Sequence, residues 1–327
     1  MPHIFNLEHD IVLALDAGKG FVPPRAARKL REDLERLPSI WVKDEDVSVW
    51  GWDAAVVAEL LRMGVAREQM PSDEQLREIR KLSNRGLAVE MLSKLRAVEG
   101  TTGLSAVCYT HEDVIRFAKE HGATILKAPW SSSGRGIKQF IVHSSSSEAL
   151  RRAELGTQFI VSSSQFIDST IAKQGSIIAE KKCDKVMDFA LEYEASKEGE
   201  ILYRGLSLFD TVNGAYKGNL LLAEEEKKEQ LGGYIARETV MEASAIIKVE
   251  MQKKLRGVYA GPFGVDMMVC QTADGYSLNP CIEINLRRTM GHVALALTEQ
   301  GYRGTMSVLY NKGKDKYELK INQNSIL

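Results

Sequence analysis

The fold is decided by the stretch Gly261–His292, which reads GPFGVDMMVCQTADGYSLNPCIEINLRRTMGH. Its first part, Val265–Val269, is apolar around a single aspartate, a pattern typical of a strand with one buried carboxylate. Asp274-Gly275 is a strong hairpin-turn dipeptide. The part after the turn, Cys281–Leu286, is again mostly apolar. The stretch therefore predicts two antiparallel strands joined by a tight turn.

Three polar side chains interrupt these strands, and we expect them to meet across the hairpin. Glu283 and Asn285 are two residues apart, so they share one strand face, and pairing would bring Asp266 beside them. A lone strand carboxylate usually faces solvent, because Asp and Glu are rarely buried without a partner. Three converging groups favour a site instead, since buried charges need partners or metals. Two carboxylates and an amide oxygen suit Mg²⁺.

Two arginines follow this polar cluster. Arg287 comes two residues after Asn285, so a continuing strand places it on the same face and puts Arg288 on the other. Two roles for Arg287 stay open. It is either a structural partner of Glu283 or Asp266, or it binds a transferring phosphate or a substrate carboxylate through its bidentate fork.

The pattern D…E-x-N-x-R on two antiparallel strands resembles the C-terminal metal site of the ATP-grasp superfamily. D-alanine–D-alanine ligase, glutathione synthetase and biotin carboxylase belong to this superfamily. The resemblance implies that Asp266, Glu283 and Asn285 are the metal ligands. It also implies a catalytic role for Arg287, which many members place two residues after the asparagine.

Composition limits the classes of function. The chain has 327 residues, of which 44% are hydrophobic and 27% charged, values ordinary for a globular protein of two domains. Its net charge of −1 gives no support to nonspecific nucleic-acid binding. The sequence shows no signal peptide, and no stretch reaches the roughly 18 apolar residues of a membrane span. We therefore expect a cytoplasmic protein without a nucleic-acid or membrane partner.

The four cysteines, Cys108, Cys183, Cys270 and Cys281, show no C-x-x-C spacing. This pattern indicates reduced thiols in a cytosolic protein rather than a disulfide framework. Cys270 and Cys281 both belong to the predicted hairpin, where a packed pair of thiols is favoured over a disulfide.

Residues 1 to 82 predict a small open α/β domain. The predicted strands are Ile11–Leu15, Ser39–Val42 and Val47–Trp50, and a helix is expected over Arg25–Leu37. Asp53 and Ser72 are expected to begin further helices as N-caps.

The segment Glu8-His9-Asp10 in this domain is unusually polar. It either lines a cleft or is a solvated N-terminal segment.

A second motif, Thr124–Gly136, reads TILKAPWSSSGRG. An apolar strand ends at Lys127, and a loop of serines and glycines leads into a second strand. Such a loop is suited to covering phosphates, because glycine lets backbone N–H groups approach them and serine adds small donors. It is not a Walker A loop, which would need G-K-[ST] and a following helix. A flexible hairpin tip with a solvated lysine is the alternative.

This loop resembles the K-x-x-x-x-S-S-G-x-G phosphate loop of ATP-grasp proteins. The resemblance implies nucleotide-binding roles for Lys127, Ser132, Ser133, Gly134 and Gly136.

Four further positions match the superfamily more loosely. Arg85 stands where many members have a lysine that reaches the phosphates. Glu180 matches the residue beside adenine, and Asp188 matches the residue beside the ribose. Lys217, in a Gly-rich loop segment, matches a residue that closes on the γ-phosphate. Lys217 is therefore the second catalytic candidate, after Arg287. The alternative in each case is an ordinary surface charge.

Together these observations predict an α+β protein with an ATP-grasp fold, in which two α+β lobes clamp ATP after a small N-terminal domain. The expected domains are 1–82 and 83–327, with a nucleotide lobe near 105–183 and a metal-binding lobe near 184–310. A helix ending at Leu255, apolar on one face, is expected to support the core beneath the hairpin.

The resemblance implies a ligase that depends on ATP and on Mg²⁺ or Mn²⁺. It would join a carboxylate to an amine through an acyl-phosphate, with small-molecule or peptide substrates, and a homodimer is compatible with it. A kinase on the same fold and a non-catalytic ATP-binding module are the alternatives. The sequence does not identify the two substrates, because pocket residues come from loops.

Overall fold

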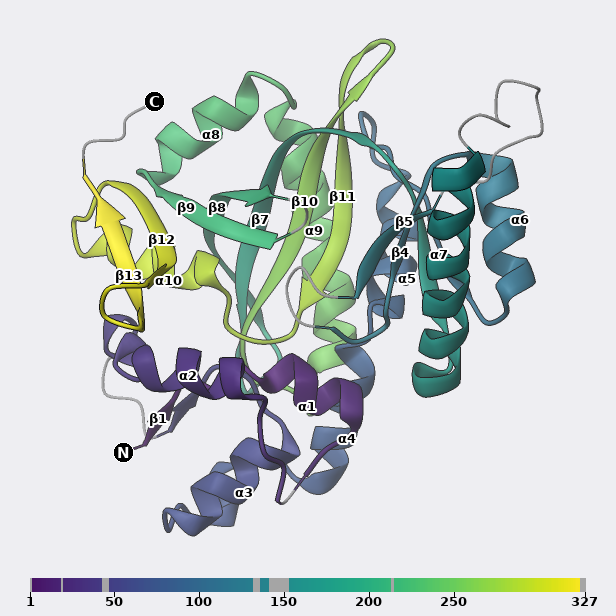
Figure 1. Cartoon of the computed structure of the whole chain (residues 1–327). Helices are drawn as coiled ribbons and strands as arrows, with labels where there is room; N and C mark the ends of the chain where they lie inside the picture. Colours follow the sequence, from purple (N-terminus) through teal and green to yellow (C-terminus); the bar gives the residue numbers. More distant parts are fainter. Residues whose placement is uncertain are drawn as a thin grey trace.

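The computed structural model describes residues 2–18, 20–42, 47–131, 136–140, 153–212 and 215–323. Two β-sheets dominate it (Figure 1). The smaller sheet and its helices lie on one side of the long β10–β11 hairpin, and the N-terminal helices lie below the larger sheet.

The N-terminal region contains a two-stranded parallel sheet and mostly short helices. Its elements are β1 (His3–Ile4), α1 (His9–Leu15), α2 (Arg25–Asp33), η1 (Leu37–Ile40), β2 (Ser48–Val49), α3 (Ala54–Arg62), η2 (Arg67–Gln69) and α4 (Asp73–Leu82). Both predicted N-caps are confirmed: Asp53 accepts a hydrogen bond from the backbone of Val56, and Ser72 forms a capping box with Gln75.

Two strand predictions in this region are wrong. The run Ile11–Leu15 belongs to helix α1, in which Val12 and Leu13 are buried together with His9. Buried positions spaced i, i+3 and i+4 are helical, but a short apolar run does not distinguish a helix from a strand. The segment 39–42 overlaps the 3₁₀ helix η1, where Pro38 in the first turn favours a helical start.

The smaller sheet has the antiparallel order β3-β6-β4-β5. Its strands are β3 (Ser105–Cys108), β4 (Thr124–Lys127), β5 (Ile137–Phe140) and β6 (Ile177–Lys181). The helices around it are α5 (Gly86–Leu95), α6 (His111–His121) and α7 (Ala153–Gln174). Leu126 and Ile177 are fully buried between the sheet and these helices.

The larger sheet has the order β11-β10-β7-β8-β9-β12-β13. Its strands are β7 (Asp184–Ala195), β8 (Ile201–Val212), β9 (Ala215–Leu221), β10 (Gly261–Thr272), β11 (Gly275–Asn285), β12 (Gly304–Asn311) and β13 (Lys316–Asn322). The helices beside it are α8 (Glu224–Gly232), α9 (Arg237–Leu255) and α10 (Met290–Glu299). The strands β12 and β13 pair as an antiparallel hairpin, and β13 is the edge strand of the sheet.

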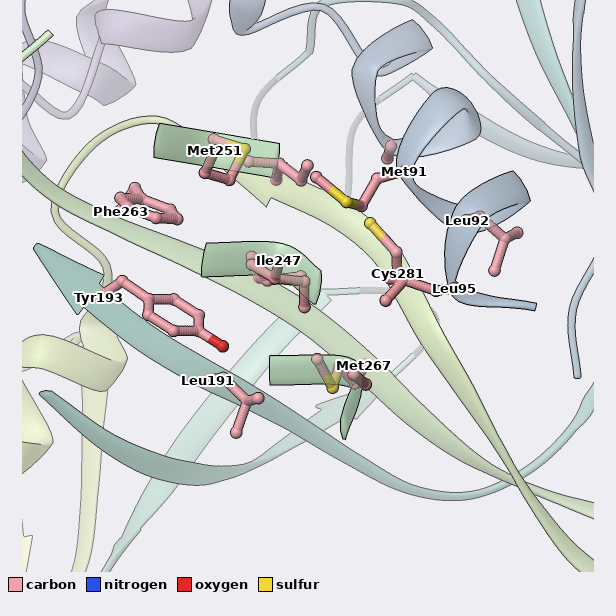
Figure 2. Packing of buried hydrophobic residues seen from close by; sticks show 14 of the residues in the cluster. Met91, Leu92, Leu95, Leu191, Tyr193, Ile247, Met251, Phe263, Met267 and Cys281 are labelled. Atoms are coloured by element: carbon pink, nitrogen blue, oxygen red, sulfur yellow. The ribbon is translucent and has the colours of Figure 1, made fainter. Parts of the chain in front are cut away.

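Alternation along the strands gives this sheet one apolar face. Figure 2 shows Tyr193 of β7 with Phe263 and Met267 of β10 packed near Ile247 and Met251 of α9. Ala243, Ile247, Met251 and Leu255 are completely buried. The core-facing helix predicted before the hairpin is therefore confirmed.

The long hairpin turns at residues 273–274, one residue before the predicted dipeptide Asp274-Gly275, whose glycine begins β11. Its register shifts between Asp266↔Glu283 and Met268↔Asn279, so three residues of β11 oppose one of β10. Pro280 lies in this bulge, as expected for a residue that has no N–H to donate to a ladder.

The α+β class is confirmed. The two sheets follow one another in the order that the ATP-grasp resemblance implies, with the phosphate-loop strands in the first and the D…E-x-N hairpin in the second. The exact domain boundaries, 1–82 and 83–327, stay a prediction.

Candidate functional site

The two hairpin carboxylates face each other directly. Asp266 pairs with Glu283 across β10 and β11, and Asn285 pairs with Gly264 two residues away, so all three side chains lie on one face. The Asn285 side chain donates a hydrogen bond of 3.1 Å to Oδ2 of Asp266. The convergence predicted from the sequence is therefore present, although the roles of these residues stay a prediction.

Burial and like charge perturb this pair. The pKa of Asp266 is raised to about 7, first because the carboxyl group is buried and then because Glu283 is nearby, while Arg287 and Asn285 act in the opposite direction. Directly opposed like charges destabilise a sheet. A divalent cation between the carboxylates would remove both penalties.

The donor set fits Mg²⁺, which takes few protein ligands and keeps several waters. Asp266, Glu283 and the oxygen of Asn285 are hard oxygen donors. Within the described residues, no group of three His, Cys, Asp or Glu side chains could hold a metal ion. The amide oxygen of Asn285 is therefore a necessary part of this donor set.

Arg85 connects the hairpin to the smaller lobe. It lies at the start of α5, where its side chain is 5% exposed, and it donates a hydrogen bond of 2.6 Å to Oε1 of Glu283. It also donates to the carbonyl of Ala128 at 2.8 Å and to the hydroxyl of Ser131 at 2.6 Å. One guanidinium thus joins the base of the phosphate loop to the proposed metal ligands.

Lys127 and Glu180 form an ion pair inside the smaller sheet. The ammonium of Lys127 lies 2.6 Å from Oε2 of Glu180, and both side chains are nearly buried. The sequence predicts separate roles for the two, Lys127 at the phosphates and Glu180 at adenine, whereas the structure places them in direct contact.

The base of the phosphate loop is well anchored. The backbone N–H of Ala128 donates to the carbonyl of Gly136 at 2.8 Å, closing the loop. Gly136 has a φ of +65°, and a Cβ there would approach Ser131 to 2.9 Å, so glycine is required. The Trp130 indole donates to the carbonyl of Arg80, whose guanidinium stacks on its ring. Ser132, Ser133 and Gly134 lie outside the described residues.

Asp188 lies on the same face as Asp266. In the ladder it pairs with Met268, and it is one of the charges that raise the pKa of Asp266. Its Oδ2 accepts hydrogen bonds of 2.6 Å from Lys185 and Thr211. This placement fits a ribose-binding acid, which stays a prediction.

The expectation of a loop around Lys217 is wrong. Lys217 lies on strand β9, with an exposed side chain. The ladder passes from Asp210↔Gly218 to Thr211↔Tyr216, which leaves Lys217 as the extra residue of a β-bulge. A bulge can redirect a side chain, so the catalytic assignment stays a prediction that now depends on a strand rather than on a loop.

Arg287 lies just beyond the end of β11, in a bend rather than in the strand. Its guanidinium binds the carboxylate of Asp10 through two hydrogen bonds of 3.0 Å. The sequence predicts Glu283 or Asp266 as the structural partner, so this part of the interpretation is corrected to Asp10 of helix α1. The pair lowers the pKa of Asp10 despite its burial.

A small recess lies where the N-terminal region meets both lobes. Its volume of about 20 Å³ is enough for about one water molecule. The residues that line it include His9, Asp10, Arg85, Ser131, Glu283 and Arg287. The alternative that Glu8-His9-Asp10 lines a cleft is thus favoured for His9 and Asp10.

His9 was not assigned a role from the sequence. Its Nδ1 lies 2.9 Å from Oδ2 of Asp53, which also accepts from Asn6, while Oδ1 accepts from the backbone of Val56. A carboxylate with this many donors holds the imidazole proton on Nδ1. Gly51 makes room for the ring, because a Cβ there would come within 2.7 Å of it.

A buried acid on the same sheet face was also missed. The Nε2 atom of His292 lies 3.1 Å from the carbonyl of Tyr193, so it must donate and Nδ1 must accept. Oε2 of Glu192 lies 3.0 Å from that Nδ1, and the hydroxyl of Thr289 donates to Oε1 at 2.8 Å. Burial raises the pKa of Glu192 to about 8, while the hydrogen bond from Thr289 acts in the opposite direction. Its place on the polar face could have been read from the alternation of β7.

Comparison with known proteins finds solved structures whose backbone follows a path similar to that of this chain. No family model and no curated protein matches this sequence. N5-carboxyaminoimidazole synthetase from Staphylococcus aureus complexed with ADP is 15% identical, with a TM-score of 0.46 over 82% of this chain and 66% of that one. Biotin carboxylase from Campylobacter jejuni is 17% identical, with a TM-score of 0.46 over 84% and 57%.

The biotin carboxylase domain of the Hydrogenobacter thermophilus 2-oxoglutarate carboxylase, in complex with MgADP and bicarbonate, is 13% identical. Its TM-score is 0.46 over 84% of this chain and 63% of that one. The chain therefore spans between 57% and 66% of the length of these solved proteins. Within the described residues, no helix is long and apolar enough to cross a membrane.

Proposed function

We propose that the chain is an ATP- and Mg²⁺-dependent ligase that joins a carboxylate to an amine or another nucleophile and releases ADP and phosphate. The observation that carries the proposal is the directly opposed pair Asp266 and Glu283 on the cleft face of the larger sheet. A structural core offers no reason to oppose two half-buried carboxylates, whereas a site for Mg-ATP does.

Asp266, Glu283 and Asn285 would hold the cation, which supplies positive charge to the phosphates of ATP. The phosphate loop would cover those phosphates, with its glycines and serines as donors. Lys127 would add a point charge, shared with Glu180 at 2.6 Å. Asp188 would accept from the ribose.

The proposed reaction has two displacements. The substrate carboxylate attacks the γ-phosphate, which gives an acyl-phosphate and ADP, and the nucleophile then displaces phosphate from the acyl carbon. The protein contributes mainly orientation and charge neutralisation. Arg85 keeps the lobes in contact through Glu283 and Ser131. The recess lined by His9 and Asp10 adjoins these groups and is our proposed part of the acceptor site.

The proposal extends to small-molecule or peptide substrates and to a cytoplasmic location. It includes a homodimer as the assembly to test, and Mn²⁺ as a substitute for Mg²⁺. No nucleic-acid or membrane partner is part of it.

The test incubates the purified full chain with Mg-ATP, hydroxylamine and a panel of amino acids, dipeptides and other carboxylates. A carboxylate that stimulates ADP release and yields a hydroxamate is the expected result. Asp266→Asn should abolish this activity, whereas Asp274→Asn, in the exposed turn of the same hairpin, should retain it.

Two other outcomes would reject the ligase. A stable phosphorylated product formed without any nucleophile would indicate a kinase. ATP binding without ADP formation across the whole panel would indicate a binding module.

A further inference from the structure

A groove lies along helix α9 on the core side of the larger sheet. Its volume is about 810 Å³, within the range of about 300–1,000 Å³ that is typical of sites for small ligands. Strand β8, helix α8 and α9 form its walls, and Leu191 of β7 lies at its floor. Leu191 precedes Glu192, which is on the cleft face, so the groove lies on the opposite face of the sheet from Asp266. The groove is therefore separate from the proposed ATP site.

The floor of the groove is apolar. Its side chains are each at most 4% exposed, and they are Leu191, Ile201, Leu206, Leu231 and Ile235. On the α9 wall, Met241 is 60% exposed and Val249 is 51% exposed. Water in the groove therefore contacts mainly hydrocarbon, and a ligand with an apolar body would gain free energy by displacing it.

Helix α9 has one face in the core and a second face in the groove. The core face is completely buried and consists of Ala243, Ile247, Met251 and Leu255. The groove face recurs at intervals of three or four residues and includes Arg237, Met241, Ser244, Ala245, Lys248 and Gln252. A surface helix needs only one apolar face, and single exposed apolar residues need no explanation. A contiguous apolar lining on a second face does need one.

The charges that line the groove are mostly positive. Of the described residues in its lining, Lys228, Arg237 and Lys248 are basic, and only Glu200 is acidic. Lys228 is paired with Glu225 at 2.7 Å. Arg237 and Lys248 form no hydrogen bond or ion pair with the described part of the chain. Two cations in the groove are thus available to an anionic ligand.

These two cations are on the same side of α9. They are 11 residues apart (248 − 237), which is about three helical turns and roughly 16 Å along the axis. Between them, the hydroxyl of Ser244 is already hydrogen-bonded to that of Tyr193 at 2.9 Å. On the opposite wall, the hydroxyl of Tyr203 donates to Glu224 at 2.7 Å. The middle of the groove therefore offers hydrocarbon, whereas charge is available near its ends.

We propose that this groove binds an amphiphile with one anionic head and a long hydrocarbon chain, of which a fatty acid is the simplest example. The head pairs with Arg237 or Lys248, either of which forms charge-assisted hydrogen bonds with a carboxylate or a phosphate. The chain lies over the apolar floor between these two cations. A second copy of the chain would also cover apolar residues, but the cores of protein interfaces are depleted of charged residues such as lysine.

The test titrates dodecanoate, dodecyl phosphate and dodecanol into the purified full chain by calorimetry, each below the concentration at which it forms micelles. At least one of the two anions should bind with a stoichiometry of one per chain. Dodecanol should bind about tenfold or more weakly, because it lacks the charge-assisted contact. The anion that binds more tightly identifies the head group as a carboxylate or a phosphate.

Variants locate the site. Ala245→Trp fills the groove from an exposed position of α9 and should abolish binding. Glu242→Trp, an equally bulky change at an exposed α9 position outside the groove, is the matched control and should retain it. The double variant Arg237→Met with Lys248→Met should lower the affinity for the anions about tenfold or more and leave that for dodecanol unchanged. Thermal melts check that each variant is folded.

Four results would overturn the proposal. These are no binding by the wild-type chain, equal binding by Ala245→Trp, dodecanol binding as tightly as the anions, and a concentration-dependent dimer that Ala245→Trp dissociates. The last result would assign the groove to a second copy of the chain. Binding of Mg-ATP is measured on the same samples, and because the two sites are on opposite faces of the sheet, the failure of either one leaves the other standing.

Discussion

The two faces of the larger sheet are built from the same strands and serve different purposes. On β10, Val265 and Met267 point into the core, and both are at most 1% exposed. Asp266, between them, points to the other face, where it meets Glu283 and Asn285. The comparison teaches that one alternating strand supplies stability on one side and holds unfavourably opposed charges on the other.

The charged face is not uniform. At one end α10 covers it, and burial there raises the pKa of Glu192 to about 8 although Thr289 donates a hydrogen bond to the carboxyl group. At the other end the carboxylates face the smaller lobe, and Arg85 contacts Glu283. The covered end holds one acid that is 1% exposed, whereas the open end holds two opposed acids, with Asn285 donating to Asp266 and Arg85 to Glu283.

The largest expected effect on stability comes from a substitution on the core face of the larger sheet. Met267→Ala should lower the free energy of unfolding by about 2–5 kcal/mol, because it removes a buried side chain and leaves a cavity. Asp266→Asn, one residue away, should leave stability unchanged or raise it, because it removes a repulsive charge. Denaturant titration of both variants without Mg²⁺ makes the comparison, and equal losses would mean that both faces are structural.

The next effect concerns the junction with the N-terminal region. Arg287→Lys keeps the charge but loses the bidentate geometry toward Asp10, and charged hydrogen bonds contribute about 1.5–3 kcal/mol. We expect a stability loss of this size, with Asp10→Asn giving a similar loss and the double variant no more than either. Unchanged stability together with a tenfold loss of turnover would favour the catalytic role of Arg287, which stays a prediction.

A smaller effect depends on pH. Glu192 has a folded-state pKa of about 8, raised from 4.5, so its stabilising protonated form is lost as pH rises through this interval. His292 has a folded-state pKa of about 3, lowered from 6.5, so stability is lost as pH falls through that interval. The two contributions oppose one another between pH 4.5 and 6.5.

Above pH 6.5 the Glu192 contribution remains, and up to about pH 7 that of Asp266, whose pKa is raised from 3.8 to about 7, adds to it; each has a slope of about 1.4 kcal/mol per pH unit at most. Glu192→Gln should therefore flatten the decline of stability that we expect between pH 7 and 8 in melting curves of the wild-type chain. An unchanged decline in the variant would show that another group titrates there.

Much of this architecture could be predicted from local patterns. The hairpin turn, the alternation of Val265–Val269 and the N-caps Asp53 and Ser72 are decided by neighbouring residues, and the structure confirms them, with the turn one residue earlier than predicted. Short segments with mixed signals were less predictable. Ile11–Leu15 has too few residues to show a helical period. The segment that forms β9 was predicted as a loop because glycines are typical of loops.

Contacts between distant segments could not be predicted. Nothing in the sequence near Arg287 points to Asp10, because 277 residues separate them and the pairing depends on how α1 docks. The same holds for Lys127 with Glu180. A single sequence shows which residue types are suited to a site, but it does not show which of them neutralise each other.

The central claim is that the cleft-face carboxylates bind ATP through Mg²⁺. Isothermal titration of ATP into the wild-type chain and into Glu283→Gln, each with Mg²⁺ and with EDTA, tests it most directly. The account predicts tight binding for the wild-type chain only when Mg²⁺ is present, and a loss of about tenfold or more in Glu283→Gln, as a lost charge contact of at least 1.4 kcal/mol requires. Equal ATP affinity with and without Mg²⁺, or in both proteins, would contradict it.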